Sequence, residues 1–122
     1  MTGWAAPVRP AIVVVGAGPE AVTRAVLAGI EEEGVPFVLE HADAAERAIE
    51  LAAAAALRSP LEVGVGIDRD GTVCVQPAKV ACAVPELVET VDAADVRVAR
   101  ILGHNAARLC VGLPLKDVAP SA

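Results

Sequence analysis

The feature that most constrains the fold is a pair of strand–helix units in the first half of the chain. Residues 11–18, AIVVVGAG, form a short β-branched run that ends in glycine, which is typical of a strand buried on both faces. Pro19 suits the first turn of the helix that follows, which we expect to end near Glu33. A second strand is expected over 35–41, and connections of helix length join parallel strands. The sequence therefore predicts a sheet that begins with parallel pairing.

An alanine-rich helix completes the second unit. It is expected to begin at Asp43, because Glu46 three residues later forms a D-x-x-E start pattern. It should continue to about Arg58, because Ser59 precedes Pro60 and a residue before proline avoids helical geometry.

A strand hairpin follows in the second half of the chain. Residues 61–68 and 72–77 are expected strands, and the Asp70–Gly71 turn between them is a strong hairpin signal. These two strands should therefore pair antiparallel. A further strand is expected over 86–91.

The last expected element is a helix that begins at Asp92, has Asp95 near its start and ends near Val111 before Gly112. The predicted order is β-α-β-α-β-β-β-α. This order predicts the α/β class, with one three-layer domain of the anticodon-binding or Rossmann-like kind. Its mixed, mostly parallel sheet has about five strands, one of them antiparallel, with helices on both faces.

Composition sets the kind of core. The 122 residues suffice for one domain, expected over 11–115 between flexible tails at 1–10 and 116–122. The chain is 55% hydrophobic, mostly alanine and valine, and Trp4 and Phe37 are its only aromatic residues. A core of small aliphatic side chains favours closely packed layers.

Charge and cysteine content disfavour several classes of protein. The net charge is −6 and no segment concentrates basic residues, so we expect no nucleic-acid partner. No apolar segment is long enough for a membrane span, and no signal peptide is visible, so we expect no membrane partner. Cys74, Cys82 and Cys110 lack metal-ligand spacing and are expected to be free thiols. These features predict a soluble cytosolic protein.

The sequence GAGPEA, residues 16–21, has the glycine spacing of a dinucleotide-binding turn. Gly16 and Gly18 would let a phosphate approach the helix N-terminus, but Pro19 removes one backbone donor. Glu20 adds a negative charge beside the site. We therefore expect a tight strand-to-helix turn without a cofactor, and a small nucleotide-binding module remains an alternative.

No catalytic constellation is indicated. His41 and His104 are the only histidines, and neither has the spacing of a Ser-His-Asp or Cys-His site. Asp68 and Asp70 flank the hairpin turn, where carboxylates more often cap the backbone. We therefore predict no catalytic residues.

Three consecutive glutamates occupy an unfavourable place, the end of the first helix just before Gly34. Each acid is disfavoured there by roughly 0.3–1 kcal/mol, because a helix C-terminus carries partial negative charge. On a helical wheel, Glu32 falls on a flank of small residues that another backbone could approach closely, bringing a cation. A solvated helix end is the alternative. The candidate interface residues, two of them on the polar face of the last helix, are Glu31, Glu32, Glu33, Ala25, Ala28, Asn105 and Arg108.

Three segments resemble a known family. They are AVLAGIEEEGVPFVLEH (25–41), RSPLEVGVGIDRDGTV (58–73) and GHNAARLCVGLPL (103–115). Together they resemble the small subunits of diol and glycerol dehydratase reactivating factors, which are similar to dehydratase medium subunits. The resemblance covers nearly the whole chain after residue 10.

This resemblance implies a mixed-sheet α/β fold and a non-catalytic, chaperone-like subunit. The implied partners are a large subunit with an actin/Hsp70-like ATPase core, which holds magnesium and ADP or ATP, and an adenosylcobalamin-dependent dehydratase. The resemblance further implies that subunit exchange with the inactivated dehydratase would let damaged cobalamin leave. By its place in the motif, Glu32 would contact the magnesium ion in the partner subunit, and Glu31 and Glu33 would shape the interface. Asn105 and Arg108 would support the fold or contact a partner.

The resemblance also implies a cytoplasmic location and no cofactor bound by this chain itself. It leaves open an association with a bacterial microcompartment, a homodimer of the isolated chain, and the substrate of the client enzyme. A medium-subunit-like component of a cobalamin-dependent dehydratase is the alternative function.

Overall fold

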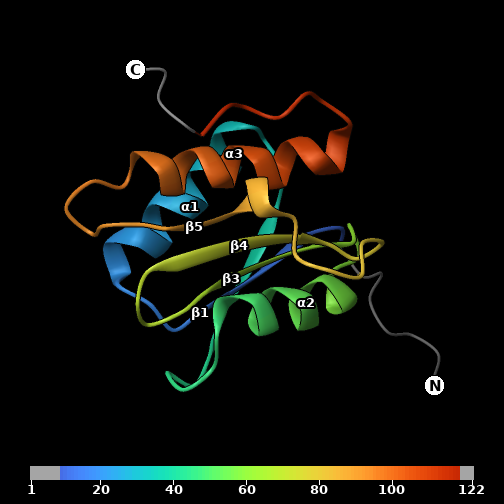
Figure 1. Ribbon diagram of the computed structural model, residues 1–122. Helices are drawn as coiled ribbons and strands as arrows, with labels where there is room; N and C mark the ends of the chain where they lie inside the picture. The colour runs from blue at the N-terminus through green and yellow to red at the C-terminus, as the bar shows by residue number, and fades with distance from the viewer. Residues whose placement is uncertain (1–8, 119–122) are drawn as a thin grey trace.

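The computed structural model describes residues 9–118 (Figure 1). The predicted order of strands and α-helices is confirmed, with one short 3-10 helix in addition. The elements are β1 (Ile12–Gly16), α1 (Glu20–Glu32), β2 (Phe37–His41), α2 (Ala48–Arg58), β3 (Val63–Ile67), β4 (Thr72–Pro77), η1 (Pro85–Leu87), β5 (Val88–Thr90) and α3 (Arg97–Val111).

The five strands form one sheet in the order β2-β1-β3-β4-β5. Strand β1 pairs parallel with β2 and β3, and β4 pairs antiparallel with β3 and β5. Figure 1 shows α1 and α3 on one face of the sheet and α2 on the other. The predicted α/β class, with a mixed sheet, one antiparallel strand and helices on both faces, is confirmed.

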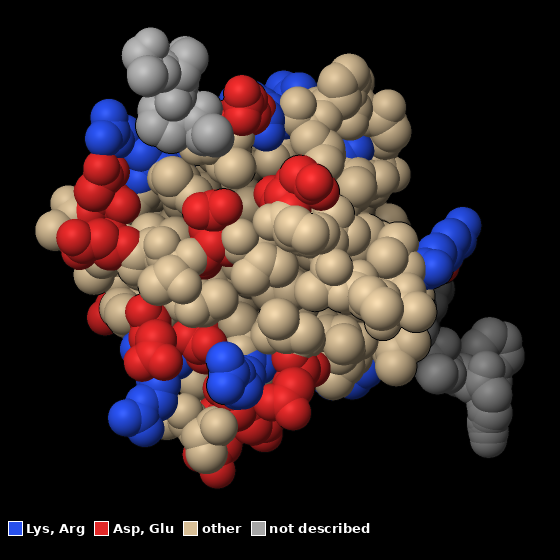
Figure 2. Space-filling model, in the orientation of Figure 1, with Lys and Arg blue, Asp and Glu red and all other residues tan. Residues whose placement is uncertain are grey.

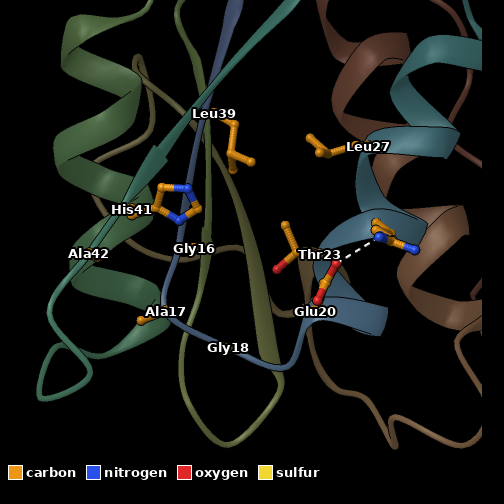
Figure 3. A pocket seen from close by; sticks show the side chains of 10 residues that line it. Gly16, Ala17, Gly18, Glu20, Thr23, Leu27, Leu39, His41 and Ala42 are labelled. Atoms are coloured by element: carbon orange, nitrogen blue, oxygen red, sulfur yellow. Dashed lines mark ion pairs between the residues drawn. The ribbon is translucent and has the colours of Figure 1, made fainter.

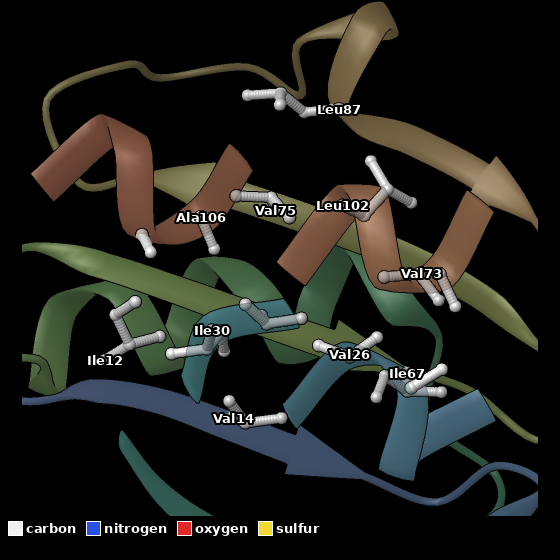
Figure 4. Packing of buried hydrophobic residues seen from close by; sticks show 14 of the residues in the cluster. Ile12, Val14, Val26, Ile30, Ile67, Val73, Val75, Leu87, Leu102 and Ala106 are labelled. Atoms are coloured by element: carbon white, nitrogen blue, oxygen red, sulfur yellow. The ribbon is translucent and has the colours of Figure 1, made fainter. Parts of the chain in front are cut away.

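Strand β1 is buried along its whole length, as its β-branched run predicts. Ile12 and Val14 belong to the main core between the sheet and the helix pair α1 and α3 (Figure 4). Val13 and Val15 point to the other face and pack against Leu51 of α2. Successive side chains of β1 therefore pack alternately into the core on one face of the sheet and on the other.

Helices α1 and α3 approach each other closely because each carries a glycine at the contact. A Cβ atom added to Gly29 would lie 2.1 Å from the carbonyl oxygen of Arg100. A Cβ atom added to Gly103 would lie 2.1 Å from the carbonyl oxygen of Val26. Gly29 of α1 therefore packs directly against the backbone of α3.

The predicted start of the second helix at Asp43 is wrong. Asp43 Oδ1 accepts a hydrogen bond from Ala45 N at 3.1 Å, which makes a local turn instead. The helix begins at Ala48, whose N–H donates to Asp68 Oδ2 at 3.3 Å. A carboxylate from the end of β3 thus serves the N-terminus of α2.

The predicted start of the last helix at Asp92 is also wrong. Asp92 Oδ1 accepts from Ala94 N at 2.9 Å in a turn, and α3 begins at Arg97. The strand expected over 86–91 is shorter, because the 3-10 helix that starts at Pro85 occupies its first residues.

Both helix ends predicted from glycine are confirmed. Gly34 follows α1 with φ of 76°, and Gly112 caps α3 with φ of 73°. Both values lie in the left-handed region, which glycine adopts without steric cost. Among the helices of residues 9–118, none has the length and apolar character of a membrane span. The first eight residues of the expected N-terminal tail, and residues 119–122, lie outside the described part.

Candidate functional site

The glutamate triplet ends α1 beside a row of basic side chains on α3. Arg100 Nε donates to Glu32 Oε1 at 2.9 Å, and Arg100 Nη2 pairs with Glu32 Oε2. His104 Nε2 lies 2.9 Å from Glu32 Oε1. Both oxygens of the Glu32 carboxylate therefore face side chains of α3.

Glu33 is held more deeply by the same helix. Arg108 Nε donates to Glu33 Oε2 at 2.9 Å, and His104 Nδ1 lies 2.6 Å from that oxygen. The side chains of Glu33 and His104 are both only 13% exposed. When the imidazole carries both protons, His104 donates to Glu32 and Glu33 together. The unfavourable charge at the end of α1 is therefore compensated within the chain.

The hydrogen bond from Arg108, followed by that from His104, holds the pKa of the Glu33 carboxyl below its usual 4.5. A lowered folded-state pKa gives stability that is present above pH 4.5 and is lost as the pH falls through the folded-state value. We expect Glu33→Gln to lower the urea midpoint at pH 7, and we expect this deficit to be smaller near pH 3.

The matched control for this pH dependence is Glu31→Gln, which makes the same charge change two residues earlier. Glu31 is exposed and has no side-chain ion pair among residues 9–118. Its urea midpoint should stay close to wild type at both pH values. A Glu33→Gln deficit that persisted unchanged at low pH would contradict the assignment to the carboxylate charge.

The remaining predicted interface residues are placed as follows. Ala25 is buried, 8% exposed, in the core, and Ala28 is half-buried. Asn105 is 1% exposed, and its amide binds the backbone of Lys116 with Nδ2 donating at 3.0 Å and Oδ1 accepting at 2.7 Å. Arg108 also donates to the carbonyl oxygen of Pro114 at 3.0 Å. Asn105 and Arg108 therefore tie the segment after α3 to the body of the domain.

The basic residues that meet the glutamates were not all identified from the sequence. Arg100 was missed, although Arg100, His104 and Arg108 recur every four residues. Such spacing places side chains on one face of a helix. This periodic row was the available signal.

A separate hollow of about 590 Å³ lies between the end of β2 and the first turns of α1 (Figure 3). Its lining includes Gly16, Thr23, Leu27, Leu39 and His41. Figure 3 shows the His41 ring and the Leu39 side chain facing α1 across the opening. Thr23 Oγ1 would lie 3.4 Å from a Cβ atom at Gly16, so the first glycine is in ordinary contact with α1.

The second glycine of GAGPEA has a packing role. A Cβ atom at Gly18 would lie 2.4 Å from the carbonyl oxygen of Asp68, so this turn lies directly against the end of β3. Asp68 is buried, 8% exposed, and its carboxylate accepts hydrogen bonds from the N–H groups of Ala48, Asp70 and Thr72. The Asp68 side chain therefore lies at the end of β3 and accepts a hydrogen bond from the N-terminus of α2.

Acidic residues follow each of the three parallel strands: Glu20 after β1, Asp43 after β2, and Asp68 and Asp70 after β3. Figure 2 shows acidic groups gathered on the left, where Figure 1 places the turns after β1 and β3. This charge disfavours a phosphate ligand at the glycine turn. Within residues 9–118, no group of three or more His, Cys, Asp or Glu side chains is arranged to hold a metal ion.

The described cysteines are free thiols, as predicted. Burial raises the pKa of the Cys74 thiol to about 11 and that of the Cys110 thiol to about 11. Neither forms the thiolate that nucleophilic chemistry requires at neutral pH.

Comparison with known proteins identifies the family. The model of the dehydratase medium subunit family matches residues 9–116. The diol dehydratase-reactivating factor small subunit of Klebsiella michiganensis is 41% identical over 83% of this chain and 78% of the relative. The propanediol dehydratase-reactivating factor small subunit of Citrobacter freundii is 39% identical over 88% of this chain and 91% of the relative.

Solved structures agree with these sequence relatives. A glycerol dehydratase reactivase chain superposes with a TM-score of 0.79 and 28% identity, covering 91% of this chain and 100% of the other. A chain of a diol dehydratase-reactivating factor complexed with ADP and Mg²⁺ superposes with a TM-score of 0.74 and 36% identity. The match covers 90% of this chain and 100% of the other. The chain thus belongs to the dehydratase medium subunit family and is similar, within it, to the small subunits of dehydratase-reactivating factors.

Proposed function

We propose that this chain is the non-catalytic small subunit of a factor that reactivates an adenosylcobalamin-dependent diol or glycerol dehydratase. It acts by exchanging with a subunit of the inactivated enzyme, so that damaged cobalamin is released. Its partner is a large subunit with an actin/Hsp70-like ATPase core, which binds the nucleotide. The observation that carries the proposal is the similarity to reactivating-factor small subunits over most of both chains.

Within this function, Glu32 is the residue that reaches the partner's magnesium site. Its carboxylate is an oxygen donor of the kind Mg²⁺ prefers, and the side chain is 37% exposed at the end of α1. The donor set fits only part of a metal site, because one carboxylate supplies few of the six ligands of Mg²⁺. The nucleotide and the large subunit would supply the others.

Exposed Glu31 belongs to the same proposed contact surface, whereas Glu33 holds the end of α1 against α3. Asn105 and Arg108 support this surface from within the domain. We place the complex in the bacterial cytoplasm, beside its client enzyme. A bacterial microcompartment is a second location compatible with this function.

The test is binding to the purified large subunit loaded with ADP and Mg²⁺, measured by calorimetry or surface plasmon resonance. Wild type should bind more tightly in Mg²⁺ than in EDTA. Glu32→Gln should weaken binding in Mg²⁺ by about tenfold, the scale of losing one well-placed charged contact. Glu31→Gln is the matched control and should retain the Mg²⁺ dependence.

A second readout tests the reactivation itself. The inactivated enzyme is represented by a dehydratase loaded with cyanocobalamin in place of its cofactor. Small and large subunits together, with ATP and Mg²⁺, should release this cyanocobalamin, whereas the large subunit alone should release much less. If the chain binds no large subunit and instead assembles stably into an active dehydratase, the alternative of an enzyme medium subunit replaces this proposal.

A further inference from the structure

We propose that Arg100 is a latch on Glu32. In the unpartnered chain it covers the carboxylate, and it must release that carboxylate before Glu32 can serve the partner's metal site. This inference rests on the proposed function, because it concerns the regulation of the residue assigned to the magnesium contact.

The first observation is the geometry of the pair. Arg100 spans both carboxylate oxygens, with Nε 2.9 Å from Oε1 and Nη2 against Oε2. His104 occupies a further contact at Oε1, 2.9 Å away. Two-point contact of this kind fixes the orientation of a carboxylate more firmly than a single hydrogen bond.

The second observation is charge. A guanidinium that spans both oxygens places its positive charge within a few ångströms of any cation bound to either of them. Like charges at that separation repel, so the same carboxylate would not serve Arg100 and a divalent ion equally well at the same time. The two states of Glu32 are therefore alternatives.

The third observation is exposure, which lowers the free-energy cost of separating Arg100 from Glu32. The Arg100 side chain is 54% exposed and that of Glu32 37%, so water is available to both after they separate. The neighbouring pair of Glu33 and His104 is much less exposed, at 13% each, and Arg108 also binds Glu33. The end of α1 therefore stays anchored to α3 when Arg100 leaves Glu32.

The latch is tested first in the isolated chain. We expect a urea double-mutant cycle with Glu32→Gln and Arg100→Gln to show coupling of about twofold to fivefold in the unfolding equilibrium constant. Arg97→Gln is the matched control. It removes the same charge from α3 but breaks a pair with Asp95, so it should be additive with Glu32→Gln. Additive effects of Glu32→Gln and Arg100→Gln would overturn the latch.

The second arm measures affinity for the large subunit loaded with ADP, with Mg²⁺ or with EDTA. Arg100→Gln should bind about threefold to fivefold more tightly in Mg²⁺, with little change in EDTA, and Arg97→Gln should bind as wild type. In the double variant with Glu32→Gln, the gain should vanish.

The outcomes separate the two proposals. Weaker binding of Arg100→Gln in Mg²⁺ would overturn the latch and make Arg100 a support for Glu32 instead. A Glu32→Gln variant that keeps the full Mg²⁺ dependence would overturn the magnesium assignment, and the latch with it, even where the isolated chain shows coupling.

Discussion

Alanine at Gly29 or at Gly103 is expected to destabilise the domain by about 2–3 kcal/mol. The added Cβ atom would lie 2.1 Å from a backbone carbonyl oxygen of the facing helix in each case. A backbone atom cannot rotate away as a side chain can, so α1 and α3 must move apart. Alanine gains roughly 1 kcal/mol of helix propensity over glycine, which offsets only part of this cost. Urea unfolding followed by circular dichroism measures the net change.

The control for these variants is Ala21→Ser, which adds one heavy atom to an exposed site on α1. It should change the free energy of unfolding by no more than about 0.5 kcal/mol. Wild-type stability of both glycine variants would show that the two helices can separate freely. The close packing described above would then contribute little to folding.

The same contact links packing to the candidate site. Gly29 lies one turn before the glutamates, and its α-carbon packs beside Gly103, next to His104. A larger distance between α1 and α3 would therefore lengthen the contacts that Glu32 and Glu33 make. Loss of Mg²⁺-dependent binding in folded Gly29→Ala protein would follow from the altered placement of Glu32.

Much of the fold was predictable because its signals are local. The β-branched run over 11–18 and the helix-length connections predicted the parallel core of the sheet, and the Asp70–Gly71 turn predicted the antiparallel strand. Helix ends at Gly34 and Gly112 were predictable because left-handed backbone favours glycine.

The helix starts were less predictable because an aspartate side chain accepts a hydrogen bond from any backbone N–H group that lies near it, whether in a turn or in a helix. Asp43 and Asp92 bond locally in turns, whereas Asp68, 20 residues from Ala48 in sequence, serves the true start of α2. Glycine spacing was ambiguous for a similar reason. Gly18 permits close approach of a backbone, and that backbone is the carbonyl of Asp68.

Only one half of the candidate site, the glutamates, could be predicted from the sequence. The glutamates and their electrostatic cost followed from the sequence, but their compensating charges come from a helix far along the chain. Arg100 is 68 residues from Glu32, and only the pairing of α1 with α3 brings them together. The tertiary contact thus turned an unfavourable helix end into an ion-paired surface.

Asp68→Ala is expected to cost about 3 kcal/mol, because the carboxylate binds three backbone N–H groups at the junction of β3, β4 and α2. Asp68→Asn should cost less. Its side-chain oxygen can still accept from Asp70 and Thr72, but its amide NH₂ would face Ala48 N, a second donor. The hairpin would keep its turn while α2 loses its partner.

Urea unfolding ranks these two variants, and hydrogen exchange at Ala48 and Thr72 locates the damage. Asp68→Asn should speed exchange at Ala48 and spare Thr72, whereas Asp68→Ala should speed both. Asp70→Asn is the control, because Asp70 is exposed and only its backbone N–H enters this network. Near-wild-type stability of Asp68→Ala would show that the three hydrogen bonds to this carboxylate contribute little to folding.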